Sequence, residues 1–317
     1  MKDVVCIGIL VADVISKPLT MFPEKGKLMP IDSITLHSGG CALSSAVDMS
    51  IIGLKTSIIG KVGKDDFGYY LKSVLERKEV NTEGLVMGEN SSTSASVVVV
   101  GDDSERSFIH CFGANAEFSY DDIDFELISN HKIAFITGVN LMASFDGAPC
   151  GKTVKKIKEL GLTTVMDTAW DSSGRWMELV KDSLPYLDYF IPSYDEATKI
   201  AGKQSPEEIA DVFMQYGVKN VVVKLGSKGC YAKNADGKEY YIPTLEGKPV
   251  ETTGAGDAFS SGFITGLSKG WDIEKSCIFA NAVGTLSVMA IGASTGIKPF
   301  EETMSFIKSQ KRMWHND

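Results

Sequence analysis

Apolar and polar residues alternate along the chain in two different repeats. Nearly continuous apolar runs, such as Val4 to Val11 before Asp13, are typical of strands buried on both faces of a sheet. Apolar residues three and four positions apart, as in Cys41 to Ile52, predict helices with one buried face. This alternation predicts an α/β fold with a largely parallel sheet covered by helices on both faces. Further strands are expected at 56–60, 133–137, 163–167, 189–192 and 221–225, and further helices at 67–78, 151–160, 176–184, 195–201, 206–216, 273–289 and 300–308.

Two segments depart from this alternation and are expected to leave the core. Residues 16–36 contain three prolines and a glycine before the alternating sequence I-D-S-I-T-L, which predicts a strand within an irregular excursion. Ser96 to Val100 and Ser107 to His110 flank a polar link and predict a hairpin. A second antiparallel pair is expected at 229–233 and 239–242.

Composition narrows the class of protein. The chain has 317 residues, 44% of them hydrophobic, which suits one large α/β domain or two smaller units. The net charge of -9, without a basic block, argues against nucleic acid or an anionic membrane as partners. Six scattered cysteines without a C-x-x-C pair argue against a zinc site or a disulfide framework. The first apolar run is too short for a membrane span, so we expect a cytoplasmic protein.

The most informative stretch is E-T-T-G-A-G-D-A-F at residues 251–259, which predicts a glycine turn that leads into a helix. Such a turn would direct the N–H groups of Ala255, Gly256 and Asp257 outward from the positive end of the helix dipole, where a phosphate binds well. Beside a bound phosphate, the Asp257 carboxylate could take a proton from a substrate hydroxyl. A helix cap beside a tight turn is the structural alternative, and the motif alone leaves both open.

Two features earlier in the chain would also suit a ligand. Asp13 follows a predicted strand, and ligands of open α/β sheets bind at the carboxyl ends of strands. Ser38-Gly39-Gly40 forms a second glycine turn before a helix, where a backbone could approach a ligand. For Asp13 the alternative is an ordinary loop aspartate. For the double glycine it is a connection that needs unusual backbone angles. The adjacent Asp65 and Asp66 are interpreted as helix caps.

Two motifs resemble nucleotide-binding loops but do not fit their templates. Residues 147–153 lack the glycine spacing of a Walker A loop, so we expect a helix start there. Gly254-Ala-Gly256 is followed by Phe259 where a dinucleotide fingerprint needs a third glycine, which weakens an oxidoreductase interpretation.

The motifs together resemble the ribokinase-like, or PfkB, family of carbohydrate kinases over nearly the whole chain. The resemblance implies one domain, residues 1–317, with a three-layer α/β/α ribokinase-like (Rossmann-like) core and a small β-sheet lid from about 14–36 and 92–112. It also implies transfer of the ATP γ-phosphate to a sugar hydroxyl. The matching segments are G-I-L-V-A-D ending at Asp13, S-G-G at 38–40, G-K-V-G-K-D-D-F-G at 60–68, F-G-A-N-A at 112–116, K-L-G-S-K-G at 224–229 and T-T-G-A-G-D-A-F at 252–259.

Site roles follow from the resemblance by position. It makes Asp257 the general base and the 254–257 turn, with Gly254, Ala255 and Gly256, the anion hole for the transferred phosphoryl group. The remaining roles concern the acceptor, the nucleotide and metal ions. Asp13, Gly39, Gly40, Ser44, Asn115 and Asn140 would face the sugar; Lys224, Gly226, Ser227, Gly229 and Asn281 would line ATP; Glu196 would organise Mg²⁺ through water; and Glu251 would belong to a loop for a monovalent cation such as K⁺.

Several residues depart from the family pattern. Ser193 replaces the asparagine of an N-x-x-E element that ends at Glu196, and Glu251 replaces an aspartate. The sugar site also loses polar groups relative to ribokinases, with Val11, Cys41, Ser44 and Asn140 at positions that carry other residues there. A site without these partners should discriminate against ribose.

We therefore expect a kinase for a ketose such as fructose or a related sugar. A nucleoside kinase of the same family, and a non-catalytic sugar- or nucleotide-binding regulator, are the alternatives. Because lid strands offer open edges, a homodimer through the lid is also expected.

Overall fold

A nine-stranded sheet forms the centre of the protein, whose computed structural model describes residues 2–19, 21–101 and 106–310. Strands β1, β4, β5, β8, β9, β10 and β11 run parallel, and β12 and β13 add an antiparallel edge. The order is β13-β12-β11-β10-β9-β8-β1-β4-β5. The strands are β1 (Lys2–Gly8), β4 (Thr56–Gly63), β5 (Asn81–Gly88), β8 (His131–Val139), β9 (Thr163–Thr168), β10 (Tyr189–Phe190), β11 (Asn220–Lys224), β12 (Cys230–Lys233) and β13 (Glu239–Ile242).

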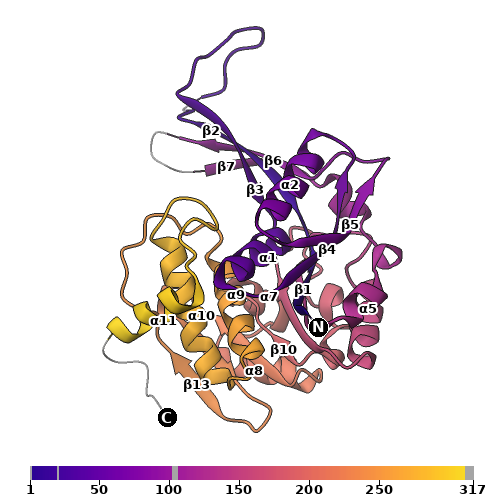
Figure 1. Cartoon of the computed structure of the whole chain (residues 1–317), viewed down its shortest axis with the longest axis vertical. Coiled ribbons are helices and arrows are strands. Elements are labelled where there is room, and N and C mark those ends of the chain that lie inside the picture. The colour runs from indigo at the N-terminus through magenta and orange to yellow at the C-terminus, as the bar shows by residue number, and fades with distance from the viewer. Residues whose placement is uncertain (1, 20, 102–105, 311–317) are drawn as a thin grey trace.

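Helices cover both faces of this sheet, because the central strands are apolar on both sides. In β1, Val5 and Ile7 face one hydrophobic core while Val4 and Cys6 face the other. Helices α5, α7 and α8 pack on the first side and α1, α2, α9 and α10 on the second (Figure 1). The helices are α1 (Cys41–Ile52), α2 (Asp66–Arg77), α3 (Gly113–Glu117), α4 (Phe125–Ser129), α5 (Ala148–Glu159), α6 (Met177–Val180), α7 (Tyr194–Ala201), α8 (Pro206–Gln215), α9 (Ala255–Ser268), α10 (Ile273–Val288) and α11 (Phe300–Ser309).

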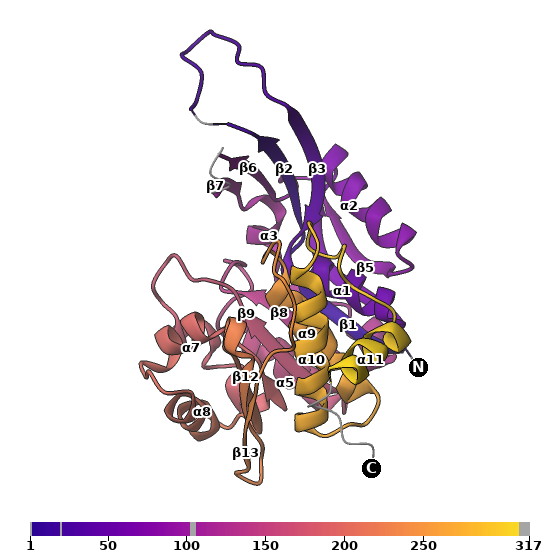
Figure 2. The same cartoon turned by 90° about the vertical axis from the view of Figure 1, so that its left-hand side faces the viewer.

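A separate four-stranded sheet, the lid, stands beyond one edge of the core (Figure 2). Its order is β3-β2-β6-β7. The strands are β2 (Val11–Lys17), β3 (Ser33–Gly39), β6 (Ala95–Val100) and β7 (Arg106–Cys111). Strands β2 and β3 are antiparallel, β2 and β6 are parallel, and β6 and β7 form the expected hairpin. The three-layer core with a small separate sheet is thus confirmed. The lid strands lie within 11–39 and 95–111, where the sequence predicts a lid from about 14–36 and 92–112.

Two expectations about the strands were wrong. The apolar run Val4 to Val11 is not one strand, because β1 ends at Gly8 and β2 begins at Val11 in the lid. Asp13 therefore lies inside a lid strand and not after a core strand. Strand β5 was not expected, since Gly84 interrupts its pattern; a Cβ at this glycine would meet Ile58 O at 2.8 Å.

Two local expectations about helix starts were confirmed. Asp65 caps α2 by accepting a hydrogen bond from Gly68 N, and the segment at 147–153 is the start of α5. Cys6, Cys41, Cys111, Cys150, Cys230 and Cys277 are all free. Within the described ranges, no helix is long and apolar enough to cross a bilayer.

Candidate active site

The glycine turn before α9 has the geometry of an anion-binding helix start. Gly254 has φ +78°, and a Cβ there would lie within 3.0 Å of Ala293, so the turn requires glycine. The expected three free N–H groups are corrected to two, because Ala255 N donates to Thr252 O at 3.2 Å within the turn. In the described structure no backbone carbonyl accepts from Gly256 N or Asp257 N, so both can serve an incoming anion.

Asp257 lies in the first turn of α9, beside this pair of N–H groups. Burial, followed by repulsion from Asp167, raises the pKa of its carboxyl group to about 7, although Lys224 and a hydrogen bond from the Cys41 thiol oppose the rise. A carboxyl group with a pKa near neutrality can accept a proton and release it again at the pH of the cell. The position and the pKa therefore suit a general base.

Lys224 carries a positive charge into the same cluster from the end of β11. Its Nζ atom lies 2.5 Å from Asp167 Oδ2, and a Cβ built on Gly256 would be 3.5 Å from it. Burial alone would lower the pKa of Lys224, but Asp167, Glu196 and Asp257 raise it above its usual value. The ammonium group is therefore charged and sits next to the anion-binding turn.

Asp167 is a site residue that the sequence analysis did not identify. It lies near the carboxyl end of β9. Its carboxylate accepts a hydrogen bond from Ser260 Oγ at 2.9 Å and forms an ion pair with Lys224. The rule that ligands bind at the carboxyl ends of strands could have selected it. Nothing in the linear sequence links it to Lys224, which lies 57 positions away.

Glu196 projects from the first turn of α7 toward this cluster. Ser193 caps the helix, and the Glu196 carboxylate accepts from Ser193 N at 3.2 Å and Thr168 Oγ1 at 3.0 Å. Burial and the neighbouring Asp167 raise the pKa of Glu196. The serine that departs from the N-x-x-E pattern thus still positions the glutamate, through an ordinary capping box.

A cavity of about 720 Å³ joins these groups to the expected nucleotide site. Its wall includes the charged cluster, the 254–257 turn and an apolar part with Leu245, Pro249 and Val288. Trp170, half exposed and stacked edge-to-face on Trp176, also lines it and was not expected. All the predicted nucleotide residues, Lys224, Gly226, Ser227, Gly229 and Asn281, lie in this wall.

On the lid side, Asp13 and the double glycine come together. A Cβ on Gly39 would lie 2.2 Å from Asp13 Oδ2, so the carboxylate passes directly over this glycine. Gly40, at φ +90°, then leads into Cys41 at the start of α1. Because the Cys41 thiol donates to Asp257, the segment from Asp13 to Cys41 connects the lid to the general base.

The predicted asparagines have clear structural partners. Asn115 is 2% exposed, and its side chain bonds both Leu10 N at 3.2 Å and Leu10 O at 2.9 Å. Asn140 has φ +86° and donates to Ala169 O, while its buried Oδ1 has no donor among the described residues. Asn281 donates to Ile242 O and Pro243 O. Ser44 is 4% exposed in the first turn of α1. Sugar binding by Asn115, Asn140 and Ser44 stays a prediction.

Glu251 connects two loops behind the turn. Its Oε2 accepts from Gly292 N at 3.0 Å, which joins the segment before α9 to the loop after α10. A role in holding a monovalent cation stays a prediction.

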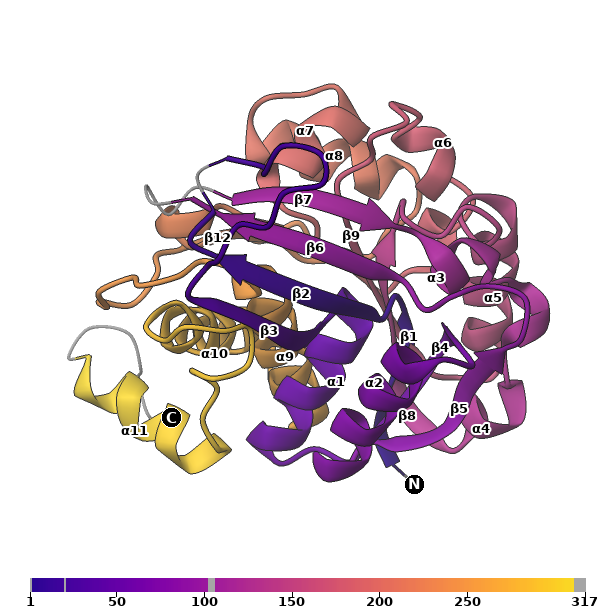
Figure 3. The ribbon, with the colours of Figure 1, turned by 90° about the horizontal axis from the view of Figure 1, so that it is seen from above.

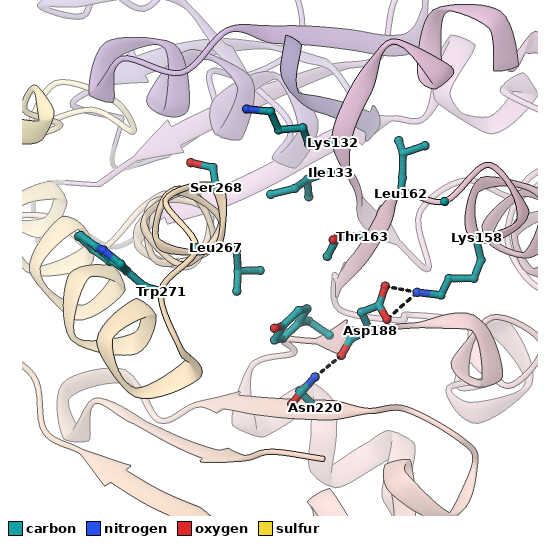
Figure 4. Close-up of a pocket in the computed structure, with 13 residues that line it drawn as sticks. Lys132, Ile133, Lys158, Leu162, Thr163, Asp188, Asn220, Leu267, Ser268 and Trp271 are labelled. Atoms are coloured by element: carbon teal, nitrogen blue, oxygen red, sulfur yellow. Dashed lines mark hydrogen bonds and ion pairs between the residues drawn. The ribbon is translucent and has the colours of Figure 1, made fainter. Parts of the chain in front are cut away.

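A second cavity, of about 450 Å³, lies at the opposite edge of the sheet, where the parallel strands begin (Figure 4). Figure 4 shows Lys158 reaching the Asp188 carboxylate, with Thr163 and Asn220 nearby. Lys219 and Thr164 N also bond Asp188, at 3.0 Å each. Since these groups satisfy one another, they leave no free base among the described residues drawn around Asp188.

Comparison with known proteins decides the family. Residues 1–299 match the pfkB family of carbohydrate kinases. The chain belongs to this family.

Two relatives match nearly the full length of this chain. An ATP-dependent 6-phosphofructokinase from Thermoanaerobacterium thermosaccharolyticum is 27% identical over 314 residues, which is 98% of this chain and 95% of that protein. A 5-dehydro-2-deoxygluconokinase from Clostridium beijerinckii is 28% identical over 331 residues, 98% of this chain and 94% of that protein.

Solved structures agree with the fold. The crystal structure of ribokinase from Thermotoga maritima has a TM-score of 0.82 and 26% identity, covering 97% of this chain and 100% of that chain. Fructokinase with bound ATP from Xylella fastidiosa has a TM-score of 0.85 over 98% of this chain and 100% of that chain, and at 20% identity it shows the fold alone. As a pfkB carbohydrate kinase, the protein is a phosphotransferase with a sugar hydroxyl as acceptor.

Proposed function

We propose that this protein is an ATP-dependent kinase for a monosaccharide, such as fructose or a related ketose. The observation that carries the proposal is the position of Asp257, with a pKa of about 7, between an anion-binding turn and the segment from Asp13 to Cys41. A proton acceptor, a phosphate site and a hydroxyl-binding carboxylate are the groups that phosphoryl transfer to a sugar requires.

In this mechanism the acceptor hydroxyl lies against Asp257, which removes its proton as the oxygen attacks the γ-phosphate. The N–H groups of Gly256 and Asp257 donate to the phosphoryl oxygens, and the Lys224 ammonium neutralises part of their charge. Asp13 accepts from sugar hydroxyls beside Gly39. The product sugar phosphate and ADP then leave, and Asp257 returns its proton to solvent.

Magnesium fits the two carboxylates near the phosphate site. Glu196 and Asp167 supply hard oxygen donors, and the mutual repulsion that raises the pKa of Glu196 would be relieved by a cation. Within the described residues, no three His, Cys, Asp or Glu side chains form a metal cage. Glu196 would therefore hold Mg²⁺ through water, and the ion would neutralise the phosphate charge.

The test is a coupled ADP-release assay with MgATP and a panel of ketoses, aldoses, sugar acids, sugar phosphates and nucleosides, each with and without K⁺. We expect turnover with a monosaccharide and a fall in kcat of about 10²-fold or more in Asp257→Asn, with ATP binding retained. Nucleoside turnover would favour a nucleoside kinase. ATP binding without turnover of any acceptor, or full activity in Asp257→Asn, would contradict the proposal. Stimulation by K⁺ would support a cation in the loop at Glu251.

We also infer a homodimer through the lid. On the face opposite Asp13, the register places Leu36, Val97 and Ile109 in one row, with side chains 38%, 41% and 57% exposed. A second copy of this apolar sheet would cover the row. Sedimentation should show a dimer that Ile109→Glu converts to monomer; a monomeric native protein at high concentration would contradict the inference.

A further inference from the structure

The main chain first crosses from the core to the lid at Ile9 and Leu10. The register of β1 with its neighbours ends at Gly8, and the register of β2 begins at Val11. Leu10 therefore lies outside both sheets, although it is completely buried. A buried N–H or C=O group without a partner is costly, so the backbone of Leu10 needs hydrogen bonds from elsewhere in the chain.

Asn115 supplies both of these hydrogen bonds. Its Oδ1 atom accepts from Leu10 N at 3.2 Å, and its Nδ2 atom donates to Leu10 O at 2.9 Å. An amide side chain can make both bonds because it carries an acceptor and a donor on one planar group. Asn115 is 2% exposed, so water does not compete for either bond. The pairing joins α3 to the residue that leads into β2.

Helix α3 is itself fixed at the base of the lid. Figure 3 shows it after the end of β7, on the side of the lid where β2 leaves β1. Ala114 N donates to Ser92 O at 2.9 Å, and Ser94 Oγ donates to Phe112 O at 2.6 Å. Asn115 therefore projects from a short helix that is bonded to the link between β5 and β6.

This link is in turn bonded to the core. Thr93 N donates to Asp65 Oδ2 at 2.7 Å, and Thr93 Oγ1 accepts from Gly63 N at 2.9 Å. Gly63 ends β4 and Asp65 caps α2, so the base of the lid is held to two elements of the core. Through Asn115, Leu10 is fixed against the same base.

The direction in which β2 leaves the core decides where Asp13 lies. Asp13 is the third residue after Leu10, about 10 Å along the strand, so a change of about 10° at Leu10 would move its carboxylate by about 2 Å. The carboxylate lies over Gly39, beside the start of α1. A misplacement of about 1 Å in a group that orients a substrate can lower the rate about 10²-fold.

We propose that Asn115 is a positioning residue for phosphoryl transfer, which fixes Asp13 relative to Asp257 by holding both backbone groups of Leu10. Asn115 itself would touch no substrate. The proposal rests on the function proposed above, because it takes Asp13 as the group that binds the acceptor. Direct binding of a sugar hydroxyl by Asn115 is the competing role, and the test distinguishes the two.

The test measures ADP release for wild type, Asn115→Ala, Asn115→Asp, Asp13→Asn and the double variant Asn115→Ala/Asp13→Asn. The acceptor is fructose, or the panel sugar that wild type uses best. We expect Asn115→Ala to lower kcat/KM for the sugar about tenfold, with the KM for ATP unchanged. Asn115→Asp keeps an acceptor for Leu10 N but has no donor for Leu10 O, so its loss should be about threefold.

The double-mutant cycle separates positioning from direct binding. If Asn115 acts through Asp13, Asn115→Ala should cost less than about twofold in the Asp13→Asn background. If Asn115 bound a sugar hydroxyl itself, the two losses would add.

Asn220→Ala is the matched control. Asn220 also joins two backbone groups, since it donates to Asp188 O at 2.9 Å and accepts from Ala235 N at 3.1 Å, but it lies at the start of β11. This variant should keep the wild-type kcat/KM for the sugar. Hydrogen exchange gives a readout without turnover: the amides of residues 10–13 should exchange at least about tenfold faster in Asn115→Ala, and at the wild-type rate in Asn220→Ala.

An unchanged kcat/KM in Asn115→Ala, additive losses in the cycle, or unchanged exchange at residues 10–13 would overturn the proposal. Should Asn115→Ala not fold, Asn115→Asp supplies the same comparisons with the smaller expected loss. If wild type releases no ADP with any acceptor, the kinase function proposed above fails. Hydrogen exchange then decides by itself whether Asn115 fixes Leu10.

Discussion

The two ends of the parallel strands of the main sheet hold carboxylates under opposite electrostatic conditions. At the amino ends of the strands, burial alone would raise the pKa of Asp188, but hydrogen bonds from Lys158, Thr164 and Lys219 lower it below its usual value. At the carboxyl ends of the strands, burial and repulsion from Asp167 raise the pKa of Asp257 to about 7. Both carboxylates line cavities, and they differ in whether the protein supplies enough hydrogen-bond donors and positive charge.

This difference separates stability from function. Asp188 has its partners within the chain, so its charge contributes to folding. Asp257 lacks enough partners, so the protein holds it ready to change protonation, at a cost to stability. The N–H groups of Gly256 and Asp257 likewise have no backbone acceptor among the described residues, so they are available to bind an anion. Three variants test this contrast, and their expected effects decrease from Asp188→Asn to Cys41→Ala.

Asp188→Asn is expected to lower the free energy of unfolding by about 2 kcal/mol at pH 7, because it removes a carboxylate that accepts from Thr164 N and pairs with two partly exposed lysines, Lys158 and Lys219. The folded pKa of Asp188 lies below the unfolded value of about 3.9, so its contribution is present above that pH and is lost as the pH falls further. Urea unfolding at pH 7 and pH 3 should show a difference that shrinks in acid. The exposed Asp236→Asn is the matched control. An unchanged unfolding midpoint for Asp188→Asn would contradict a stabilising role at this edge.

Lys224→Met is expected to reduce kcat/KM for ATP about tenfold, because a charge-assisted contact to phosphate is lost. Lys224 also lowers the pKa of Asp257, so its removal should move the acid limb of the pH–rate profile to higher pH. The double variant Lys224→Met/Asp167→Asn controls for the carboxylate left unpaired. A profile that stays in place would show that Lys224 and Asp257 are not coupled.

Cys41→Ala should have the smallest effect. The thiol is a weak donor, so loss of its hydrogen bond to Asp257 should raise the pKa of the base slightly and reduce the rate at pH 6 about twofold. Cys41→Ser, which keeps a donor, should restore the rate. Equal loss in both variants would point to packing and not to the hydrogen bond.

Much of the fold could be predicted from periodicity. The helix bounds Cys41–Ile52, the β6–β7 hairpin and the glycine turn at α9 all follow local signals. The division of the first apolar run could not be predicted, because Ile9 and Leu10 are as buried as the strand before them and no polar residue marks the crossing from core to lid.

The site was predictable where one short segment builds it, as at residues 254–257. It was not predictable where distant segments meet. Asp167 and Lys224 form an ion pair although they lie 57 positions apart in the sequence. The side-chain amide of Asn115 donates to Leu10 O, which lies 105 positions away. The alignment of Asp13 with His37 and Ser96 across the lid depends on the register of neighbouring strands, which composition does not encode.

The contrast between Asp188 and Asp257 is tested most directly by measuring the stability of Asp257→Asn as a function of pH. The folded pKa of about 7 lies above the unfolded value near 3.9, so the wild-type protein should lose stability as the pH rises between them. The asparagine variant should therefore be more stable than wild type at pH 8 and no more stable at pH 4. A variant less stable than wild type at pH 8, or a difference that does not change with pH, would contradict the account.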